Sequence, residues 1–338
     1  MPWLSPAGVS YLELRVHFVR EQLMTSARSV QTHAGAIAQP KRSGRTLKPS
    51  TREALYGYLL ASPWLIGFLL FTAGPLIASF VIGLYNTDFL TTFEFVGFKW
   101  YQNVLTDSLV RKALINTALF SFAVVPLNTV IALFIAVLLN QGVVGQSFWR
   151  TLYYLPSVVS GVAVALLFAW LYHPDIGLFN SVLARFGIQG PRWLYSEAWA
   201  LPAIILMSLW GAGSAMLIYL AGLRGIPTAL YEAAQIDGAS SVRRFFSITL
   251  PLLTPTIFFN VVLNIIGSWQ VFTAAYVMTD GGPNNATLTM VLHIYRTGFR
   301  NSYFGYASAQ AWLLFMIVLV FVILALRSAR AWVHYDRV

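Results

Sequence analysis

The stretch Tyr231–Pro251, YEAAQIDGASSVRRFFSITLP, decides the fold: it is a long polar, charged segment between two apolar spans. Its Glu232-Ala233-Ala234 triplet favours a short helix, because Ala and Glu are good helix formers. Asp237-Gly238-Ala239 is a turn signal, since glycine adopts the φ > 0 conformations that a sharp reversal needs. Phe245 and Pro251 follow at helical distance and close the unit before the next span. The segment predicts a helix, a glycine-hinged turn and a second helix at a membrane surface.

Composition places the chain in a membrane. Of its 338 residues 57% are hydrophobic and only 10% are charged, whereas soluble domains carry about 25% charged residues. Charge-free stretches long enough to span cover Ala54–Thr87, Ala113–Trp149, Thr151–Pro174, Ala198–Leu223, Phe245–Thr279 and Asn301–Leu326. A bilayer core needs about 20 apolar residues per helix. The predicted fold is therefore an all-α integral membrane protein with about six transmembrane helices.

Within these stretches the apolar runs and turn signals predict the helices themselves. The expected spans are Tyr56–Leu84, Leu114–Leu139, Pro156–Tyr172, Ala200–Leu220, Leu252–Met278 and Ala307–Leu326. The opening segment then forms a cytoplasmic loop between spans four and five. The orientation follows from the positive-inside rule: a cytoplasmic N-terminus places 15 of the 22 Lys and Arg residues inside and 7 outside. Both termini are predicted to be cytoplasmic, and the net charge of +10 follows from topology and anionic lipid without a nucleic-acid partner.

The first 50 residues differ from the rest. Ser10–Met24 mixes apolar and charged residues, as an amphipathic helix on the inner leaflet would, and Gln39–Ser50 is typical of a flexible basic linker. An extended or misassigned start, with Met24 as the initiator, explains the same residues. These residues contain no apolar run that is followed by a small-residue cleavage site, so we expect no cleaved signal peptide. The predicted division is a basic cytoplasmic N-terminal tail, residues 1–50, and a transmembrane domain, residues 51–338.

The chain shows no energy source and no catalytic motif. A P-loop needs Gly-Lys followed by Ser or Thr, and none of the four lysines is followed by either residue. The expected spans carry no charged group for ion coupling. Cys is absent, the histidines form no metal-ligand spacing, and neither G-x-S-x-G nor H-E-x-x-H occurs. We expect no catalytic residue, no metal site and no cofactor on this chain.

The order E-A-A, three residues, G and a distant P in Tyr231–Pro251 resembles the coupling loop of ATP-binding-cassette importer permeases. The Asp237-Gly238-Ala239 variant is similar to the carbohydrate branch of that family, the maltose and glycerol-phosphate type. The resemblance implies that Glu232 pairs with a basic group at the rim of an ATPase groove, that Ala233 and Ala234 permit close helix approach, and that Gly238 makes the turn. An ordinary solvated inner loop is the structural alternative.

A second resemblance lies in Val277–Leu314. Gly281-Gly282-Pro283, the pair Ala286-Thr287, and Gly305 through Ala309 look like sugar permeases in particular, and the small residues allow close helix packing. Together the two resemblances imply a permease subunit that imports a sugar, oligosaccharide or related polyol by alternating access. They also imply a second, different permease as heterodimer partner, a dimer of ATP-binding subunits and an extracytoplasmic solute-binding protein.

The expected substrate path follows one face of span five. Asn260, Asn264 and Ser268 are spaced by four residues and stack on one helix face, with Trp269 and Gln270 beside them. Amides reading hydroxyls and an aromatic face against a pyranose ring suit a neutral sugar. The alternative is hydrogen bonding that only holds helices together. Lesser candidates are Asn116, Asn128, Trp210 and Gln310.

Other functions remain open at this point. Within the family, the outer charges Arg185, Arg192, Arg296 and Arg300 are compatible with an importer of glycerol phosphate or another polar solute. From other classes, a secondary transporter or channel would need no ATPase, and a membrane-embedded enzyme would need titratable groups inside the spans. The charge-free spans and the coupling motif argue against both.

Overall fold

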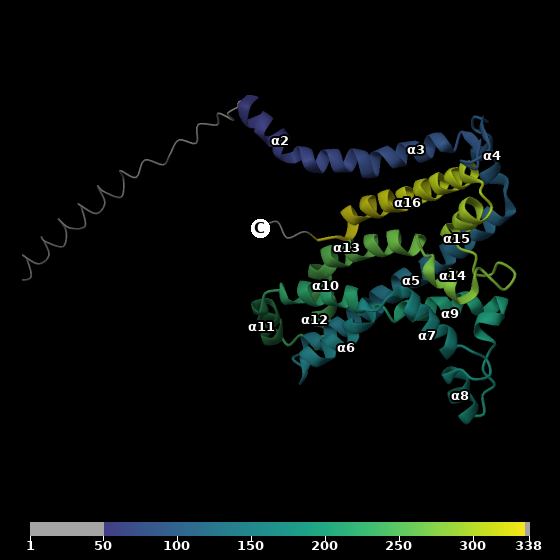
Figure 1. The fold of residues 1–338 in the computed structure, drawn as a ribbon. Helices are drawn as coiled ribbons and strands as arrows, with labels where there is room; N and C mark the ends of the chain where they lie inside the picture. Colours follow the sequence, from purple (N-terminus) through teal and green to yellow (C-terminus); the bar gives the residue numbers. More distant parts are fainter. Residues whose placement is uncertain (1–50, 335–338) are drawn as a thin grey trace, which may run out of the picture. The chain divides into compact units, whose positions relative to one another are not determined.

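The computed structural model describes residues 51–334, and the predicted tail at residues 1–50 lies outside them. Contacts divide the chain into two units, Met1–Phe68 and Leu69–Val338. The described part of the first unit is the helix α2 (Thr51–Phe68). The second unit is a helical bundle with one small hairpin (Figure 1). The division at residues 50 and 51 stays a prediction.

The elements of the second unit follow in a simple order. They are η1 (Leu69–Ala73), α3 (Gly74–Ile82), β1 (Tyr85–Thr87), β2 (Phe93–Phe95), α4 (Lys99–Thr106), α5 (Ser108–Asn140), α6 (Gln146–Val158), α7 (Gly161–Leu171), α8 (Leu178–Arg185), η2 (Trp193–Tyr195), α9 (Glu197–Leu209), α10 (Gly213–Arg224), α11 (Thr228–Ile236), α12 (Ser241–Arg244), η3 (Phe245–Thr249), α13 (Leu250–Trp269), α14 (Thr273–Thr279), α15 (Met290–Tyr295), η4 (Arg296–Arg300) and α16 (Phe304–Trp332).

Four helical stretches of the described chain are long and apolar enough to cross a membrane, or up to six if each bent pair is one span. The four are Tyr56–Ile82, Ser108–Asn140, Ser241–Trp269 and Phe304–Trp332, and the bent pairs are α6 with α7 and α9 with α10. The prediction of an all-α membrane protein with about six spans is confirmed at this level. Spans three and four, however, are broken, which the sequence pattern did not predict.

Span three differs most from the prediction. The expected helix Pro156–Tyr172 crosses a 96° bend between α6 and α7. Pro156 lies in the last turn of α6, and Ser160 has an extended backbone before α7 begins. The 11 residues of α7 extend about 16 Å, about half of a bilayer core. This segment alone cannot span.

Span four bends by 43° at Trp210–Ala212. Gly213, the first residue of α10, allows the backbone of α6 to come close, because a Cβ there would meet the Tyr153 carbonyl oxygen at 2.0 Å. Span five also ends earlier than expected. The helix stops at Trp269, and Thr273–Thr279 forms the separate α14, so the predicted end at Met278 was wrong.

Two π-helical segments, η1 and η3, are each explained by a proline that follows them in the next helix. η1 ends two residues before Pro75, and η3 ends two residues before Pro251. A proline ring crowds the carbonyl four residues earlier in an α-helix, and a wider turn relieves that contact. In η3 the Leu250 N–H accordingly bonds to the carbonyl five residues back, on Phe245.

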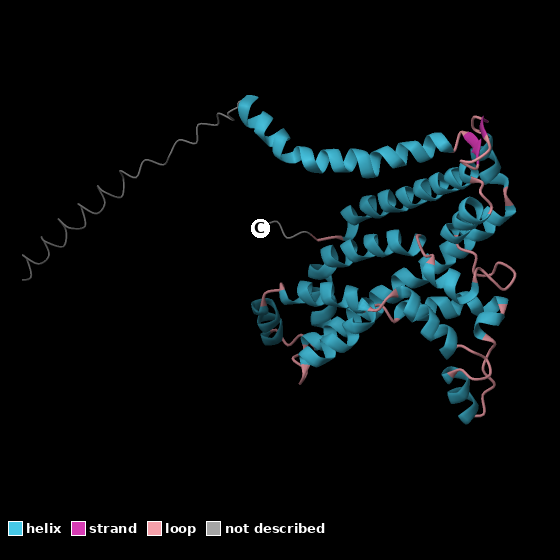
Figure 2. Ribbon diagram, viewed as in Figure 1, coloured by secondary structure: helices cyan, strands magenta, loops and turns pink. Residues whose placement is uncertain are grey.

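The hairpin was not predicted. β1 and β2 pair antiparallel, with Tyr85 opposite Phe95 and Thr87 opposite Phe93, and β1 contacts the start of α16 (Figure 2). We call the end with the hairpin, α4, α8, α14 and α15 the α15 end. The opposite end, with α11, α12 and the C-terminal ends of α5 and α10, is the α11 end (Figure 1).

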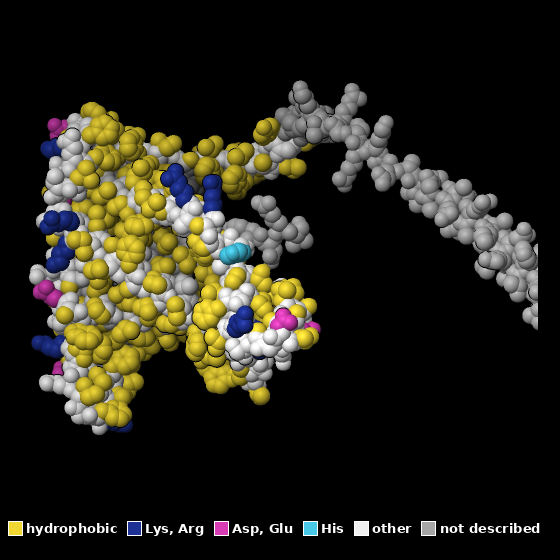
Figure 3. Space-filling view, turned by 180° about the vertical axis from the view of Figure 1, so that it is seen from behind, with side chains coloured by type: hydrophobic (Ala, Val, Ile, Leu, Met, Phe, Trp, Pro, Cys, Tyr) yellow, Lys and Arg dark blue, Asp and Glu magenta, His cyan; other side chains and the backbone are white. Residues whose placement is uncertain are grey.

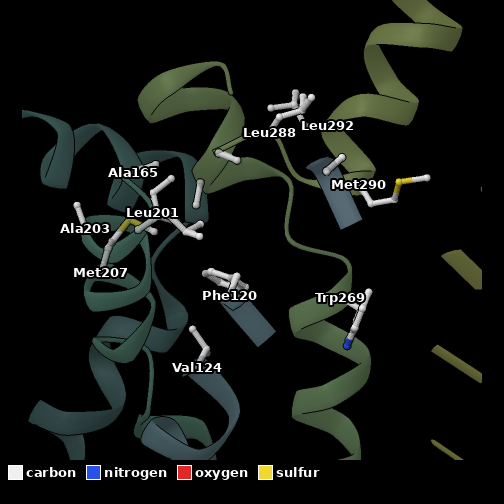
Figure 4. Packing of buried hydrophobic residues seen from close by; sticks show 14 of the residues in the cluster. Phe120, Val124, Ala165, Leu201, Ala203, Met207, Trp269, Leu288, Met290 and Leu292 are labelled. Atoms are coloured by element: carbon white, nitrogen blue, oxygen red, sulfur yellow. The ribbon is translucent and has the colours of Figure 1, made fainter. Parts of the chain in front are cut away.

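Buried apolar side chains form two clusters. The larger joins α5, α7, α9, α13, α14 and the segment around α15, with Phe120, Leu201, Trp269 and Met290 among its members (Figure 4). The smaller joins the C-terminal half of α5 with α10 and the start of α13, around Met216, Tyr219 and Leu253. The two clusters attach the α11 end and the α15 end to the same long helices.

Candidate functional site

The opening segment folds as a helix, a turn and a helix at the α11 end. α11 ends at Ile236, and Gly238 follows with φ of +76°, the left-handed conformation that favours glycine. The Ala239 N–H donates to the Ala234 carbonyl at 2.9 Å, which satisfies a carbonyl at the helix end. Ser240 then caps α12 by accepting from the Arg243 N–H at 3.3 Å. The local geometry agrees with the predicted glycine-hinged turn.

The second helix is not a separate surface helix. α12, η3 and α13 run on as one stretch, Ser241–Trp269, long enough to cross a membrane. Phe245 begins η3 and Pro251 is the second residue of α13, so both lie inside this stretch. The expectation that they close a unit before the next span was wrong. A displacement of the turn would therefore be transmitted directly to this spanning helix.

The exposed side of this turn offers groups to a partner. Glu232, Ala233, Asp237 and Gly238 are exposed, while Ala234 and Ala239 are half-buried. Glu232 has no ion pair among the described residues. The hydroxyl of Tyr231 hydrogen-bonds that of Thr249 at 2.9 Å and ties α11 to η3. Figure 3 shows acidic and basic side chains gathered at this end beside hydrophobic ones.

The surroundings of Gly238 have room for a side chain, but its backbone conformation is unfavourable for one. No described atom lies within 4 Å of an added Cβ, so a side chain there would meet no steric clash. The positive φ would strain any β-branched residue. The effect of a substitution there would therefore act through the backbone of the turn.

The predicted substrate path is only partly free. Asn260 is buried and donates to the Thr256 carbonyl of its own helix at 3.0 Å. Ser268 bonds the Ser121 hydroxyl of α5 at 2.6 Å, as helix-joining polar residues do. Trp269 is buried and stacks on Phe321 with ring centroids 5.1 Å apart.

The side chains of the remaining two residues of that path are not held by hydrogen bonds. Asn264 is half-buried and Gln270 is exposed, and neither side chain makes a hydrogen bond within the described chain. The structure thus leaves Asn264 and Gln270 available to a solute and uses the other three for packing. A transport role for the path stays a prediction.

The lesser candidates are mostly structural. Asn116 donates to the carbonyls of Asn285 and Leu288 at 2.9 and 3.1 Å, and Trp210 packs edge-on against Phe168. The amide nitrogen of Gln310 lies 3.3 Å from the Nε2 atom of the buried His293. Asn128 differs, because its buried Oδ1 atom has no hydrogen-bond partner in the described chain.

The segment around Gly281-Gly282-Pro283 folds into a tightly bonded cap at the α15 end. The Thr287 hydroxyl lies in hydrogen-bond contact with the Thr279 hydroxyl and donates to the Gly282 carbonyl. The Thr289 hydroxyl donates to the Val271 carbonyl. Asp280 pairs with Arg300 at 2.9 Å and with Arg296 at 3.6 Å. The turn residues predicted the reversal, but no local signal indicated these contacts.

Metal chemistry has no support in this geometry. Among the side chains of residues 56–334 no group of three or more His, Asp or Glu is placed to hold a metal ion. The exposed side chains of the turn at the α11 end are instead suited to contact with another protein.

Comparison with known proteins agrees with this geometry. Residues 128–332, more than half of the chain, match the family model "Binding-protein-dependent transport system inner membrane component". The chain belongs to this family. It is therefore a multi-pass membrane permease subunit of a binding-protein-dependent transport system, and the predicted non-catalytic transport role is confirmed on that basis.

Relatives of known name extend the match to nearly their whole length. The "Probable ABC transporter permease protein YesP" of Bacillus subtilis (strain 168) is 41% identical over 89% of this chain and 98% of its own. The "Trehalose/maltose transport system permease protein MalF" of Thermococcus litoralis is 37% identical over 84% and 97%. The "sn-glycerol-3-phosphate transport system permease protein UgpA" of Escherichia coli is 33% identical over 86% and 99%.

A solved structure shows the same fold. A chain of the bacterial alginate ABC transporter, solved with an alginate pentasaccharide-bound periplasmic protein, superposes with a TM-score of 0.71 at 26% identity. The superposition covers 85% of this chain and 98% of that chain. The resemblance drawn from the coupling segment to ATP-binding-cassette permeases is confirmed.

Proposed function

We propose that this permease imports a neutral sugar or oligosaccharide by alternating access, driven by ATP hydrolysis in partner subunits. Relatives named for trehalose/maltose transport and a structural neighbour from an alginate transporter support a carbohydrate solute. The free amides of Asn264 and Gln270 on span five are suited to hydroxyl groups, and no charged side chain lies on that helix within Leu250–Trp269.

The observation that carries the proposal is the continuity of the α11–Gly238–α12 turn with a spanning helix. α11 presents an unpaired, exposed Glu232, and the chain runs without a break from Ser241 to Trp269. A partner that moves α11 would therefore move span five as a rigid element. Glu232, Ala233, Ala234, Asp237, Gly238 and Ala239 would form the ATPase-docking surface, with Phe245 and Pro251 in the helix that transmits the motion.

The proposed assembly follows from this role. Both termini and the α11 end lie on the cytoplasmic side, where a dimer of ATP-binding subunits docks and holds ATP and Mg. A second, different permease completes the pore as a heterodimer. An extracytoplasmic solute-binding protein delivers the solute at the α15 end. The two permeases lie in the lipid of the cytoplasmic membrane.

Glycerol phosphate is the second candidate solute, because UgpA is also similar to this chain. The cationic groups that would favour an anion are partly used. Arg296 and Arg300 both pair with Asp280, which leaves Arg185 and Arg192 at the α15 end without an ion pair in the described chain. Asp280 offsets one of the two positive charges of Arg296 and Arg300, and this partial neutralisation favours the sugar over the phosphate ester.

The test is to purify the tagged full chain from its native membrane in mild detergent and identify what accompanies it. Recovery of a Walker-motif ATPase and a second permease is expected. ATP hydrolysis by the reconstituted complex should then rise with a sugar and its binding protein, and not with glycerol phosphate. Recovery of the chain without an ATPase in several detergents would contradict the proposal.

Gly238→Val sharpens this test. Valine at φ of +76° strains the turn, so ATP hydrolysis should continue while transport falls at least tenfold. Gly187→Val is the matched control, since Gly187 has φ of +73° and equally open surroundings but lies after α8. Transport lowered equally by both variants would show general strain rather than lost coupling.

A further inference from the structure

An open hollow of about 320 Å³ lies at the α11 end, beside the docking turn. It is bordered by the C-terminal ends of α5 and α10, by α11, and by the first turns of the stretch Ser241–Trp269. The polar residues that line it, beside apolar ones, are Asn140, Gln141, Tyr231, Ser241, Arg244 and Thr249. Among the described residues no Asp or Glu lines this hollow, so the one charged residue of this lining is an arginine.

Arg244 is the central group and is poorly satisfied by the protein. Its guanidinium donates one hydrogen bond, from Nη2 to the Ser241 hydroxyl at 3.1 Å. Its Nε atom is buried with no partner, and it forms no ion pair among residues 56–334. A guanidinium has five N–H donors and is always charged, so a half-buried Arg without a carboxylate has donors left for an anion.

Arg244 also borders a second hollow of about 290 Å³, which contains Asp237 and Arg243. The carboxylate of Asp237 is exposed and does not pair with either arginine. The acidic group is thus on the other side of Arg244, and the 320 Å³ hollow keeps a net positive lining.

The helix ends act in both directions. Ser241 is the first residue of a 29-residue helical stretch, whose N-terminal end carries partial positive charge toward the hollow, whereas the C-terminal ends of α5 and α10 carry partial negative charge there. The full charge of Arg244 therefore decides the sign of the lining. At the C-terminal end of α5, the Leu139 carbonyl already accepts from the Gln146 side chain. The neighbouring Asn140 and Gln141 side chains contribute amide donors to the lining.

We propose that this hollow binds a phosphate group, held by the Arg244 guanidinium, the Ser241 hydroxyl and the amides of α5. A bidentate Arg–phosphate contact would satisfy the donors that the protein leaves free. The phosphate belongs either to the headgroup of an anionic membrane lipid or to a soluble phosphate compound. The occupied site would tie α5 and α11 to the start of span five, whatever solute the permease carries and whichever leaflet the α11 end faces.

Binding to the purified, delipidated full chain tests this site directly, without ATPase or transport. Native mass spectrometry would follow adducts of phosphatidylglycerol, with diacylglycerol as the phosphate-free control. Equilibrium dialysis with radiolabelled inorganic phosphate would test the soluble source. We expect phosphatidylglycerol to bind, and Arg244→Gln to weaken that binding at least about tenfold, because charge-assisted hydrogen bonds are lost.

The matched control is Arg224→Gln, which removes the same charge from an exposed arginine at the same end that lines neither hollow. Phosphate binding that depends on Arg244 but is not displaced by phosphatidylglycerol would assign the site to a soluble compound. Equal loss in both variants, or no loss in Arg244→Gln, would overturn the proposal. If Arg244→Gln does not fold, Arg244→Lys and Ser241→Ala provide the same comparison, each with an expected several-fold weakening.

Discussion

The two ends of the bundle satisfy their polar groups in opposite ways. At the α15 end, the described ion pairs, Asp280 with Arg296 and Arg300, join residues 16 and 20 positions apart. At the α11 end, Glu232, Arg243 and Arg244 lie close together in sequence, and none of them forms an ion pair in the described chain. The α15 end thus pairs some of its charges internally, although Arg185 and Arg192 there form no ion pair in the described chain, whereas the α11 end pairs none of these three.

Long-range hydrogen bonds show the same contrast. The α15 end is tied to α5 by Asn116 and Thr117, whose partners lie 169 to 173 residues away. The Arg300 guanidinium also lies over the rings of Tyr276 and Tyr295, at 5.5 and 5.9 Å from their centroids. At the α11 end, by contrast, the side-chain hydrogen bond between Arg224 of α10 and Gln146 of α6 joins residues only 78 positions apart.

This difference has a mechanical meaning. Groups that are satisfied within one chain resist movement, whereas unpaired groups on a short exposed helix gain free energy when a partner supplies their contacts. We infer that the α15 end is built for rigidity and the α11 end for docking. The comparison predicts that stability of the isolated chain depends on the α15 end and that coupling depends on the α11 end.

The largest loss of stability is expected for Gly305→Ala at the α15 end. An added Cβ would lie 1.8 Å from the backbone oxygen of Tyr85 in β1, and neither backbone can yield easily. We expect a loss of about 2–3 kcal/mol, typical of overpacking, measured by thermal unfolding in detergent. Gly267→Ala is the control, because that helical glycine has open surroundings and should be neutral or slightly stabilising.

A smaller loss is expected for Thr117→Val. The Thr117 hydroxyl is fully buried and accepts from the Met290 N–H at 2.9 Å. Valine keeps the shape but leaves that N–H unpaired, at a cost of about 1–3 kcal/mol. Thr151→Val, which removes an exposed hydroxyl bonded within its own helix, should change stability by less than about 0.5 kcal/mol. Equal effects of the two variants would remove the basis for a rigid α15 end.

The sequence predicted the parts of this contrast that depend on local pattern. Charge-free stretches located the spans, and the Asp237-Gly238-Ala239 signal located the turn with its positive φ. The breaks in spans three and four escaped prediction because the residues around them are as apolar as the rest, so hydropathy does not change at a bend.

The site chemistry was harder to predict. Asn260, Ser268 and Trp269 share a helix face as expected, but only the fold shows that their partners are Thr256, Ser121 and Phe321. The Ser268–Ser121 bond joins residues 147 positions apart and leaves no periodic signal in a single sequence. The hollow beside Arg244 was missed for the same reason, since four separate helices border it.

A pH-dependent effect should follow from His293 at the α15 end. Burial lowers the pKa of its imidazole, Asp107 opposes this shift, and Arg296 adds to it. The Gln310 amide contacts its Nε2 atom, and Tyr306 donates to Asp107 at 2.6 Å. The neutral imidazole is favoured in the folded state, so its contribution to stability is full above pH of about 6.5 and is lost as pH falls through the lowered pKa.

The measurement is the melting temperature of the wild type and of His293→Gln between pH 8 and pH 5. The wild type should lose stability more steeply below pH of about 6.5 than the variant does. His173→Gln, at a half-buried histidine whose hydrogen bonds go only to nearby backbone, is the matched control and should follow the wild type. Identical slopes for wild type and His293→Gln would assign the acid sensitivity to other groups.

The smallest effect on stability is expected at the α11 end, from Glu232→Gln. Its carboxylate is exposed and has no ion pair in the described chain, so the isolated subunit should melt within about 0.5 kcal/mol of the wild type. If that carboxylate pairs with a basic group on an ATPase, the same change should sharply lower the amount of ATPase recovered with the tagged chain. Glu94→Gln, at an exposed carboxylate of β2, is the control and should leave that recovery unchanged. Destabilisation of the isolated subunit by Glu232→Gln would mean that the chain itself satisfies this charge, and the two ends would then differ in degree only.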